Sequence, residues 1–312
     1  MTLCIEFVMM SIETVRIRNF MSNLKKIAIT TDSNSGILPE ELQHEGVFIL
    51  PMPFLIDGAP YYENVNLTQD EFYVLLNKQA TVSTSQPSPA DMAEFWTEIL
   101  KEYDEIVHIP MSSGLSQSCA SAAITAQDFD GKVHVVDNRR ISVTLKESVF
   151  NALALRAQGK SAAEIKEYLI DTASDSSIYI AVDTMKYLKK GGRVTPAAAM
   201  IGTILKIKPI LQIHGDKLDK FALPRNMLKA KEIMKEAVKK DLENIYSDYL
   251  ANGELELCVA HTNNEAQAEI FLKEVQAAFP NIPVRFCEPL SLSISCHTGP
   301  GALGISVTRI VK

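Results

Sequence analysis

Residues 106–123 read IVHIPMSSGLSQSCASAA, and this stretch decides which fold we expect. An apolar run from Ile106 to Ile109 predicts a buried strand, a hydroxyl-rich turn follows Pro110, and an alanine-rich segment near Ala120 predicts a helix. A strand, a turn and a helix in this order are typical of an α/β domain with a parallel sheet. In such domains the turns after the strands form the edge at which ligands bind.

The turn holds four serines within the seven residues Ser112–Ser118 and contains no Lys or Arg. Free N–H groups at a helix start, together with hydroxyls, favour an anionic or carbonyl oxygen. Because the turn has no cation, a single carboxylate is favoured over a polyphosphate. An alternative interpretation is that the serines only cap the helix and fill the turn. However, one cap does not require four serines.

The rest of the chain predicts two domains and an α/β fold class. Strands alternate with helices over residues 25–173, which predicts a three-layer α/β/α domain with a mainly parallel sheet. The strand predicted at Val47–Ile56 contains Pro51 and Pro53 and should therefore leave the central ladder. Residues 174–312 mix hairpins with helices, which predicts an α+β domain with a mixed or antiparallel sheet. A cleft between the two domains is where we expect a ligand.

Composition narrows the class of protein. The net charge of −7 argues against nucleic-acid binding. The five cysteines are odd in number and lack CxxC spacing, so neither a disulfide framework nor a zinc site is predicted, and a reducing cytoplasm is expected. No apolar run approaches the roughly 18 residues that span a bilayer. Residues 1–24 are expected to be an extension, either disordered or produced by an upstream start, because Met21 shortly precedes the first predicted strand.

Two further segments carry side chains that suit a binding site. Thr84 and Ser85 precede a predicted helix, and the helix start alone would explain them. Their hydroxyls would meet those of the Ser112–Ser118 turn if the strands before the two turns were neighbours. The run CHTGPG at residues 296–301 places His297 beside glycines that permit close backbone approach, although a lone histidine is often structural.

Two arginines are candidates for contact with a phosphate or a partner. Arg193 ends the run KKGGR at residues 189–193. An alternative interpretation is that this run is only a helix C-terminus, where cations interact favourably with the helix dipole. Arg225 follows Pro224 and is predicted to be exposed. The phosphate-binding pattern GxxxxGK[ST] and the dinucleotide pattern GxGxxG are absent, and no cluster has metal-ligand spacing.

Six blocks in a fixed order give the chain, from Lys26 onward, a resemblance to the DegV family. They are IAITTDS (27–33), TSQPS (84–88), SSGLS (112–116), YLKKGGR (187–193), IG with LKIKPI (201–202 and 205–210), and HTGPGALG (297–304). Each block is weak alone, and the set is specific. The chain departs from the family at Gln117, where glycine is usual, and we expect this to alter the turn, because Gln disfavours positive φ.

The resemblance implies a two-domain protein that holds a long-chain fatty acid in a tunnel between its domains and is not itself an enzyme. It implies that Thr84 and Ser116 hold the carboxylate and that Ser85, Ser113 and His297 complete the polar pocket. No cofactor is implied besides the bound fatty acid, of the palmitate, stearate or oleate type. An uncharged pocket would suffice for the head group, and burial there should raise the pKa of the carboxylic acid.

The resemblance also implies a partner, because some members of the family present the fatty acid to a separate fatty acid kinase, which forms an acyl phosphate. Arg193 and Arg225 are then candidates for contact with the phosphate or the kinase. Besides this lipid-binding hypothesis, a serine hydrolase or acyltransferase stays open. In that alternative Ser113 or Ser116 would act with His297, although the third group of a triad is not visible in the sequence.

Overall fold

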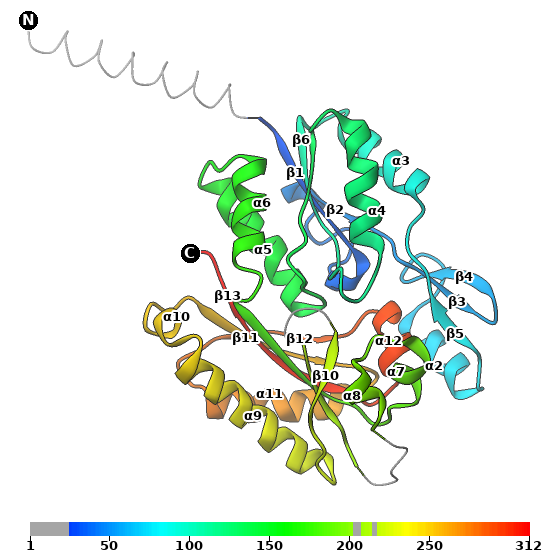
Figure 1. The fold of residues 1–312 in the computed structure, drawn as a ribbon, viewed down its shortest axis with the longest axis vertical. Helices are drawn as coiled ribbons and strands as arrows, with labels where there is room; N and C mark the ends of the chain where they lie inside the picture. Colours follow the sequence, from blue (N-terminus) through cyan, green and yellow to red (C-terminus); the bar gives the residue numbers. More distant parts are fainter. Residues whose placement is uncertain (1–24, 202–206, 214–216) are drawn as a thin grey trace, which may run out of the picture.

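The computed structural model describes residues 25–201, 207–213 and 217–312, and it consists of two large sheets with a small third sheet beside them (Figure 1). The extension predicted at residues 1–24 and part of the fifth block, residues 202–206, lie outside the described residues. Within the described ranges, no helix is both long enough and apolar enough to cross a membrane.

The first sheet is parallel and carries helices on both faces, which confirms the three-layer arrangement. Its strands stand in the order β2-β1-β6-β7. Their bounds are β1 Ile27–Asp32, β2 Val47–Leu50, β6 Glu105–Ile109 and β7 Val133–Val135. One face packs against α5 (Val143–Ala157) and α6 (Ala162–Asp171), and the other against α3 (Pro89–Ile99) and α4 (Ser118–Thr125). Short 3₁₀ turns occur at Ser33–Ser35, Gln43–Glu45 and Ala126–Phe129.

The segment predicted as one interrupted strand at Val47–Ile56 divides between two sheets at its prolines. After β2, residues Pro53–Ile56 form β3, which pairs with β4 (Ala59–Tyr62) and β5 (Val82–Thr84) in a separate three-stranded sheet. Asp57 and Gly58 close the β3–β4 hairpin with φ values of 50° and 86°, as a tight hairpin turn requires. Helix α2 (Gln69–Asn77) follows and starts with a capping box at Thr68.

The second large sheet is mixed, with the order β10-β9-β8-β13-β11-β12. The bounds are β8 Ser176–Ala181, β9 Ile210–Ile213, β10 Leu218–Ala222, β11 Leu255–His261, β12 Val284–Pro289 and β13 Leu303–Arg309. Only the β11–β12 pair is parallel within the described residues. The helices in this part are α7 Lys186–Gly191, α8 Pro196–Ala199, α9 Met227–Asn244, α10 Ser247–Ala251, α11 Glu265–Ala278 and α12 Leu292–Thr298. This arrangement confirms the predicted mixed or antiparallel sheet.

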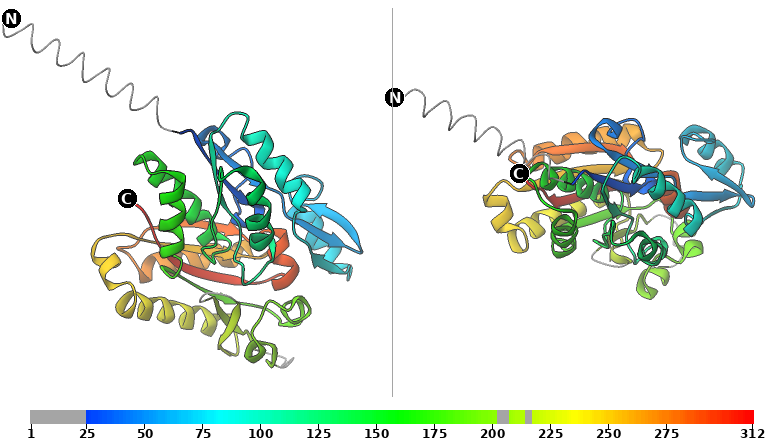
Figure 2. Two further views of the ribbon diagram at one scale, coloured as in Figure 1. Left: turned by 45° about the horizontal axis from the view of Figure 1, so that its top comes forward. Right: turned by 90° about the horizontal axis from the view of Figure 1, so that it is seen from above.

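Helix α12 connects the small sheet to the second large sheet. Its side chains Leu292 and Cys296 are buried in one apolar cluster with Phe54 of β3 and Phe72 of α2. Both views of Figure 2 place the small sheet directly beside α12, which is far from it in the sequence. This contact brings the end of β5 next to the C-terminal part of the chain.

Helix α5 lies between the two large sheets and buries a carboxyl group there. The Glu147 side chain is fully buried, and its Oε2 accepts a hydrogen bond from Arg285 Nη1 at 3.2 Å. The same guanidinium also binds Glu256 at 3.1 Å, so two carboxylates share one cation. Burial therefore raises the pKa of Glu147 above its usual range, in spite of Arg285.

We predict that Glu147 makes the protein less stable as the pH rises. The folded state holds this proton to a higher pH than the unfolded state, so the contribution to stability is complete below about pH 4.3. It is then lost as the pH rises through the folded-state pKa, by about 1.4 kcal/mol for each pH unit that separates the folded and unfolded pKa values. Urea denaturation of the Glu147→Gln variant at several pH values should show a shallower decline than the wild type. The exposed Glu167→Gln variant serves as control, and equal slopes in all three proteins would contradict the prediction.

Candidate functional site

Two serine hydroxyls of the Ser112–Ser118 turn accept hydrogen bonds from backbone N–H groups of the same turn. Ser112 is fully buried, and its Oγ accepts from Gly114 N, so it shapes the turn. Ser116 Oγ accepts from Ser118 N at 3.1 Å at the start of α4, and its own proton remains available to another acceptor. Gln117 has φ −80° and ψ −1°, an ordinary right-handed conformation. Gln117 therefore fits this turn without the positive φ that a glutamine disfavours.

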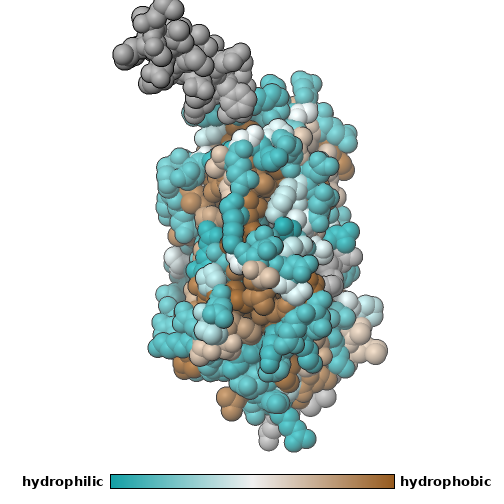
Figure 3. Space-filling model, turned by 90° about the vertical axis from the view of Figure 1, so that its left-hand side faces the viewer, coloured by the Kyte–Doolittle hydropathy of each residue, from teal (hydrophilic) through white to brown (hydrophobic). Residues whose placement is uncertain are grey.

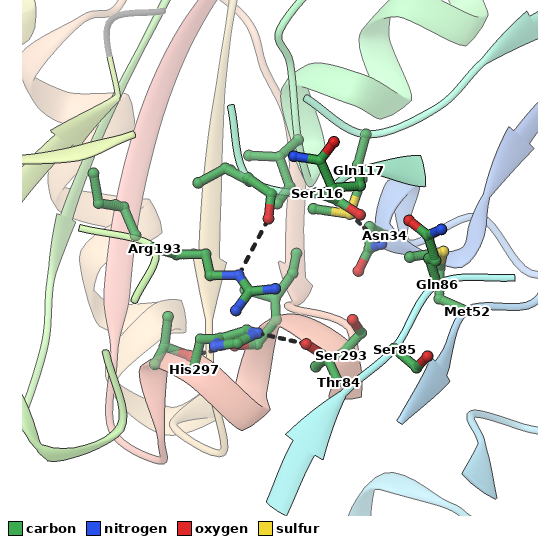
Figure 4. A pocket seen from close by; sticks show the side chains of 16 residues that line it. Asn34, Met52, Thr84, Ser85, Gln86, Ser116, Gln117, Arg193, Ser293 and His297 are labelled. Atoms are coloured by element: carbon green, nitrogen blue, oxygen red, sulfur yellow. Dashed lines mark hydrogen bonds between the residues drawn. The ribbon is translucent and has the colours of Figure 1, made fainter. Parts of the chain in front are cut away.

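A cavity of about 260 Å³ opens beside this turn, and most of the predicted site residues line it (Figure 4). Its wall includes Thr84 at the end of β5, Ser85, Ser116, His297 and Arg193. We call this space the polar cavity. The strands before the Thr84 and Ser116 turns are not neighbours, because β5 pairs with β3 and not with β6. The assumption of adjacent strands is thus wrong, and α12 brings the two turns together instead.

Two of the predicted site residues lie elsewhere. Ser113 is half-buried and is not part of the cavity wall, and its backbone N–H points to Asp137 Oδ1 at 3.4 Å. Arg225 is exposed just before α9, also outside the wall. Asn34 and Ser293, which were not predicted, also line the polar cavity. Asn34 could have been found, since it follows β1 in the same way that Ser112 follows β6, whereas no local signal marks Ser293.

Thr84 and His297 form a hydrogen-bonded pair inside this cavity, with 2.9 Å between Thr84 Oγ1 and His297 Nε2. Burial, and secondarily the charge of Arg193, lowers the pKa of His297 to about 4, so the ring is neutral at pH 7. Its Nδ1 is buried without a hydrogen-bond partner. If Nε2 carries the proton and donates to Thr84, the Thr84 hydroxyl is free to donate into the cavity.

Arg193 brings a positive charge to the wall, so the uncharged pocket that we expected is wrong. Its Nε donates to the Leu115 carbonyl at 3.2 Å, and its Nη1 donates to the Gly191 carbonyl at 2.5 Å. These bonds fix the guanidinium between the serine turn and the ring of His297 (Figure 4). They use two of the five N–H donors of an arginine, so the others can serve a ligand.

An apolar cavity of about 60 Å³ adjoins the polar cavity. The two share Leu115, Ile141, Leu218, Ile294 and Thr298 in their walls. Farther in, the wall is formed by Ile178 and Ile180 of β8, Cys258 of β11 and Ile305 of β13, and almost all of its surface is hydrocarbon. We call this space the apolar cavity. Figure 3 shows from the side an apolar patch near the middle of the molecule, bordered by hydrophilic side chains.

The site does not have the arrangement of a serine hydrolase. His297 Nε2 bonds to a threonine, its Nδ1 lacks the acidic partner of a triad, and Ser113 is outside the cavity. In the described part of the chain, no group of three or more His, Cys, Asp or Glu side chains could hold a metal ion. What the arrangement offers is a set of hydroxyl and guanidinium donors next to a narrow hydrocarbon space.

Fold and site define an α/β protein with two large sheets and a small third one, in which a polar cavity and an apolar cavity share part of their walls. A family model described as uncharacterised proteins of the DegV family matches residues 26–309, so the chain belongs to the DegV family. A DegV domain-containing protein of Staphylococcus aureus is 28% identical over 289 residues, which cover 92% of this chain and 100% of the relative.

Solved structures agree with this assignment. A DegV family protein from Thermus thermophilus, described by its fatty acid binding, superposes with a TM-score of 0.82 at 28% identity, covering 91% of this chain and 100% of that one. DegV from Bacillus subtilis, described as a fatty acid binding protein, gives 0.80 at 27% identity, with 91% and 99% covered.

We predict that His297 stays neutral down to about pH 5. A buried histidine with a lowered pKa contributes stability that is complete above about pH 6.5 and is lost as the pH falls toward the folded-state value of about 4. A ¹H–¹³C NMR titration of the ring, assigned with His297→Gln, should show no midpoint between pH 5 and 8. A midpoint near 6.5 would show that the ring is not desolvated in this way.

Gly191 offers a steric test of the Thr84–His297 pair. A Cβ at this position would lie 2.0 Å from His297 Nδ1. Gly191→Ala should therefore displace the ring, break the bond to Thr84 and lower the free energy of unfolding by about 1–3 kcal/mol. Thermal denaturation measures the effect, with Lys189→Ala on the exposed face of α7 as control. If both variants melt like the wild type, the ring is not confined as described.

Proposed function

We propose that this protein binds a long-chain fatty acid, with its carboxylate in the polar cavity and its chain in the apolar cavity. The observation that carries the proposal is the shared wall between a space with free hydrogen-bond donors and a space lined by hydrocarbon. The relatives from T. thermophilus and B. subtilis, both described as binding fatty acids, support it. A chain of the palmitate, stearate or oleate type gains about 0.8 kcal/mol for each buried CH₂ group.

In this proposal Thr84 and Ser116 each donate a hydroxyl proton to one carboxylate oxygen. The neutral His297 ring orients the Thr84 hydroxyl through the Nε2 bond, and Ser85 lines the same cavity. Arg193 is the nearby cation, and an opposite charge favours the ionised form of a carboxylic acid. The ligand is therefore bound as a carboxylate, in contrast to the raised pKa that an uncharged pocket would produce.

A role as the substrate-carrying subunit of a fatty acid kinase system extends this proposal. Arg193 lies beside the place of the carboxylate, where an acyl phosphate would need a positive charge. Arg225 is exposed and could contact a kinase catalytic subunit. This role makes the protein a carrier and not the catalyst, and the location that we propose is the cytoplasm. Mixing delipidated protein with palmitate, ATP and a fatty acid kinase should yield palmitoyl phosphate only when both proteins are present.

The serine hydrolase is the second candidate, and the geometry favours it less, because the histidine is bonded to Thr84. A fluorophosphonate probe separates the two functions. Stoichiometric labelling of Ser116 would support the hydrolase, whereas a binding protein should remain unlabelled and should release intact fatty acid on extraction with organic solvent.

We predict that Thr84→Val and Ser116→Ala each weaken palmitate binding by about 1–3 kcal/mol, because each variant removes one donor from a buried carboxylate. Ser113→Ala is the matched control, since Ser113 belongs to the same turn but not to the cavity wall. Isothermal titration of delipidated protein measures the affinities. If palmitate does not bind the wild type, the proposed function is wrong. If all three variants bind it as well as the wild type does, the assigned carboxylate site is wrong.

A further inference from the structure

A third cavity, of about 570 Å³, lies next to the apolar cavity and has no part in the site described so far. Its wall includes Ile170 of α6, Ala173 just after this helix, and Ser176 of β8. Two further residues, Ile178 and Ile213, belong to the walls of both this cavity and the apolar cavity. We call the third space the outer cavity, because part of its wall is exposed at the surface.

One face of strand β8 lines both cavities. Ser176, Ile178 and Ile180 are alternate residues of this strand, and alternate residues point to the same side of a sheet. Ser176 lines the outer cavity, Ile178 lines both cavities, and Ile180 lines the apolar cavity. At about 3.3 Å per residue, these three side chains form a stripe roughly 13 Å long. The same face of β8 therefore runs from one cavity to the other.

The boundary between the two cavities is made of hydrocarbon side chains. Ile178 and Ile213 stand directly opposite each other in the antiparallel β8–β9 pair, so their side chains are neighbours on one face of the sheet. Both are half-buried. The start of α5 follows the same boundary, since Val143 lines the apolar cavity and Thr144 lines the outer one. A hydrocarbon chain that passes beside the isoleucine pair breaks no side-chain hydrogen bond of that pair.

The apolar cavity alone is small for a long chain. Its volume is about 60 Å³, and a group of the size of a water molecule needs about 10–15 Å³, so it has room for roughly four to six methylene groups. The polar cavity takes the carboxylate and the first part of the chain. The end of a longer chain then needs further apolar surface, and the outer cavity is the space that adjoins the apolar cavity along β8.

The wall of the outer cavity is part hydrocarbon and part polar. Ile170 and Ala173 offer apolar surface, and 39% of Ile170 is exposed. Asp137 and Ser174 belong to the same wall. A chain end in this space therefore keeps some contact with water, and each methylene group gains less there than it would by full burial.

We propose that the protein also binds fatty acids longer than stearate, and that the end of their chain passes beside Ile178 and Ile213 into the outer cavity. This inference rests on the proposed function, because it places the carboxylate at Thr84 and Ser116. The outer cavity is then a separate site for the methyl end of the chain, and the isoleucine pair lies where the chain enters it.

The test is a competition between palmitate and docosanoate, a saturated acid with a longer chain than stearate. Delipidated protein is equilibrated with an equimolar mixture, and the acids extracted from the re-isolated complex are quantified by mass spectrometry. Ser176→Phe fills the outer cavity, since Ser176 lines this cavity but neither of the other two. The variant should still bind palmitate. Its docosanoate-to-palmitate ratio should fall below that of the wild type, by up to roughly 4-fold for each methylene group displaced.

Ser247→Phe is the matched control. Ser247 is an exposed serine at the start of α10 and belongs to none of the three cavity walls. The change of side chain is the same, so the ratio should remain that of the wild type. Near-UV circular dichroism verifies that both variants are folded.

A photoreactive ligand locates the chain end on the wild-type protein, without any substitution. Docosanoate that carries a diazirine at the end of its chain is bound and irradiated, and the labelled peptides are identified by mass spectrometry. The label should appear on the segment 170–176, which contributes Ile170, Ala173 and Ser176 to the outer cavity. Excess unlabelled docosanoate should prevent the labelling.

The outcomes separate this inference from the proposed function. A wild type that binds palmitate and excludes docosanoate would overturn the inference and leave the fatty-acid site standing. A ratio that Ser176→Phe leaves unchanged, or that Ser247→Phe lowers equally, would also overturn it, as would the absence of label from the segment 170–176. Failure of both acids to bind would overturn the proposed function itself.

Discussion

The burial of helix α12 against the small sheet is the contact on which the site depends. Leu292 and Cys296 share an apolar cluster with Phe54 and Phe72, so the helix is packed against a part of the chain that is more than 200 residues away. Without this packing, the end of β5 would have no reason to face the C-terminal part of the protein. Hydrophobic contacts outside the cavity therefore determine its shape. The same contacts position the polar side chains of its wall.

That packing also determines the electrostatics of the cavity. Burial lowers the pKa of the imidazole, and the fixed guanidinium beside it acts in the same direction. The two side chains therefore have different roles toward an anionic ligand. His297 is a neutral hydrogen-bonding group, and Arg193 supplies the positive charge. Arg193 is itself held by two carbonyls, from Leu115 on one side and Gly191 on the other, so its position depends on both halves of the chain.

Local signals in the sequence were sufficient to predict the helices and strands. They were not sufficient to predict which distant elements contact one another. The strand, turn and helix around Ser116 and the departure from the central ladder at Pro51 and Pro53 depend on residues close in the chain, and the structure confirms them. Contacts between distant elements have no such local signal. The sequence therefore did not reveal that α12 joins the two turns, or that Arg193 makes the cavity charged. Which serine of a turn faces inward depends on backbone angles that composition does not encode.

Two ionisable side chains lie at or behind the otherwise hydrocarbon wall of the apolar cavity. Cys258 lines it, and Glu147 of α5 lies behind the thiol. Burial raises the pKa of both groups, which favours their neutral forms. A neutral wall excludes a cationic or anionic group on the ligand, because neither would find a counter-charge there. A methylene chain is the kind of group that such a wall accepts. The same burial that couples stability to pH at the sheet interface thus limits what the cavity can hold.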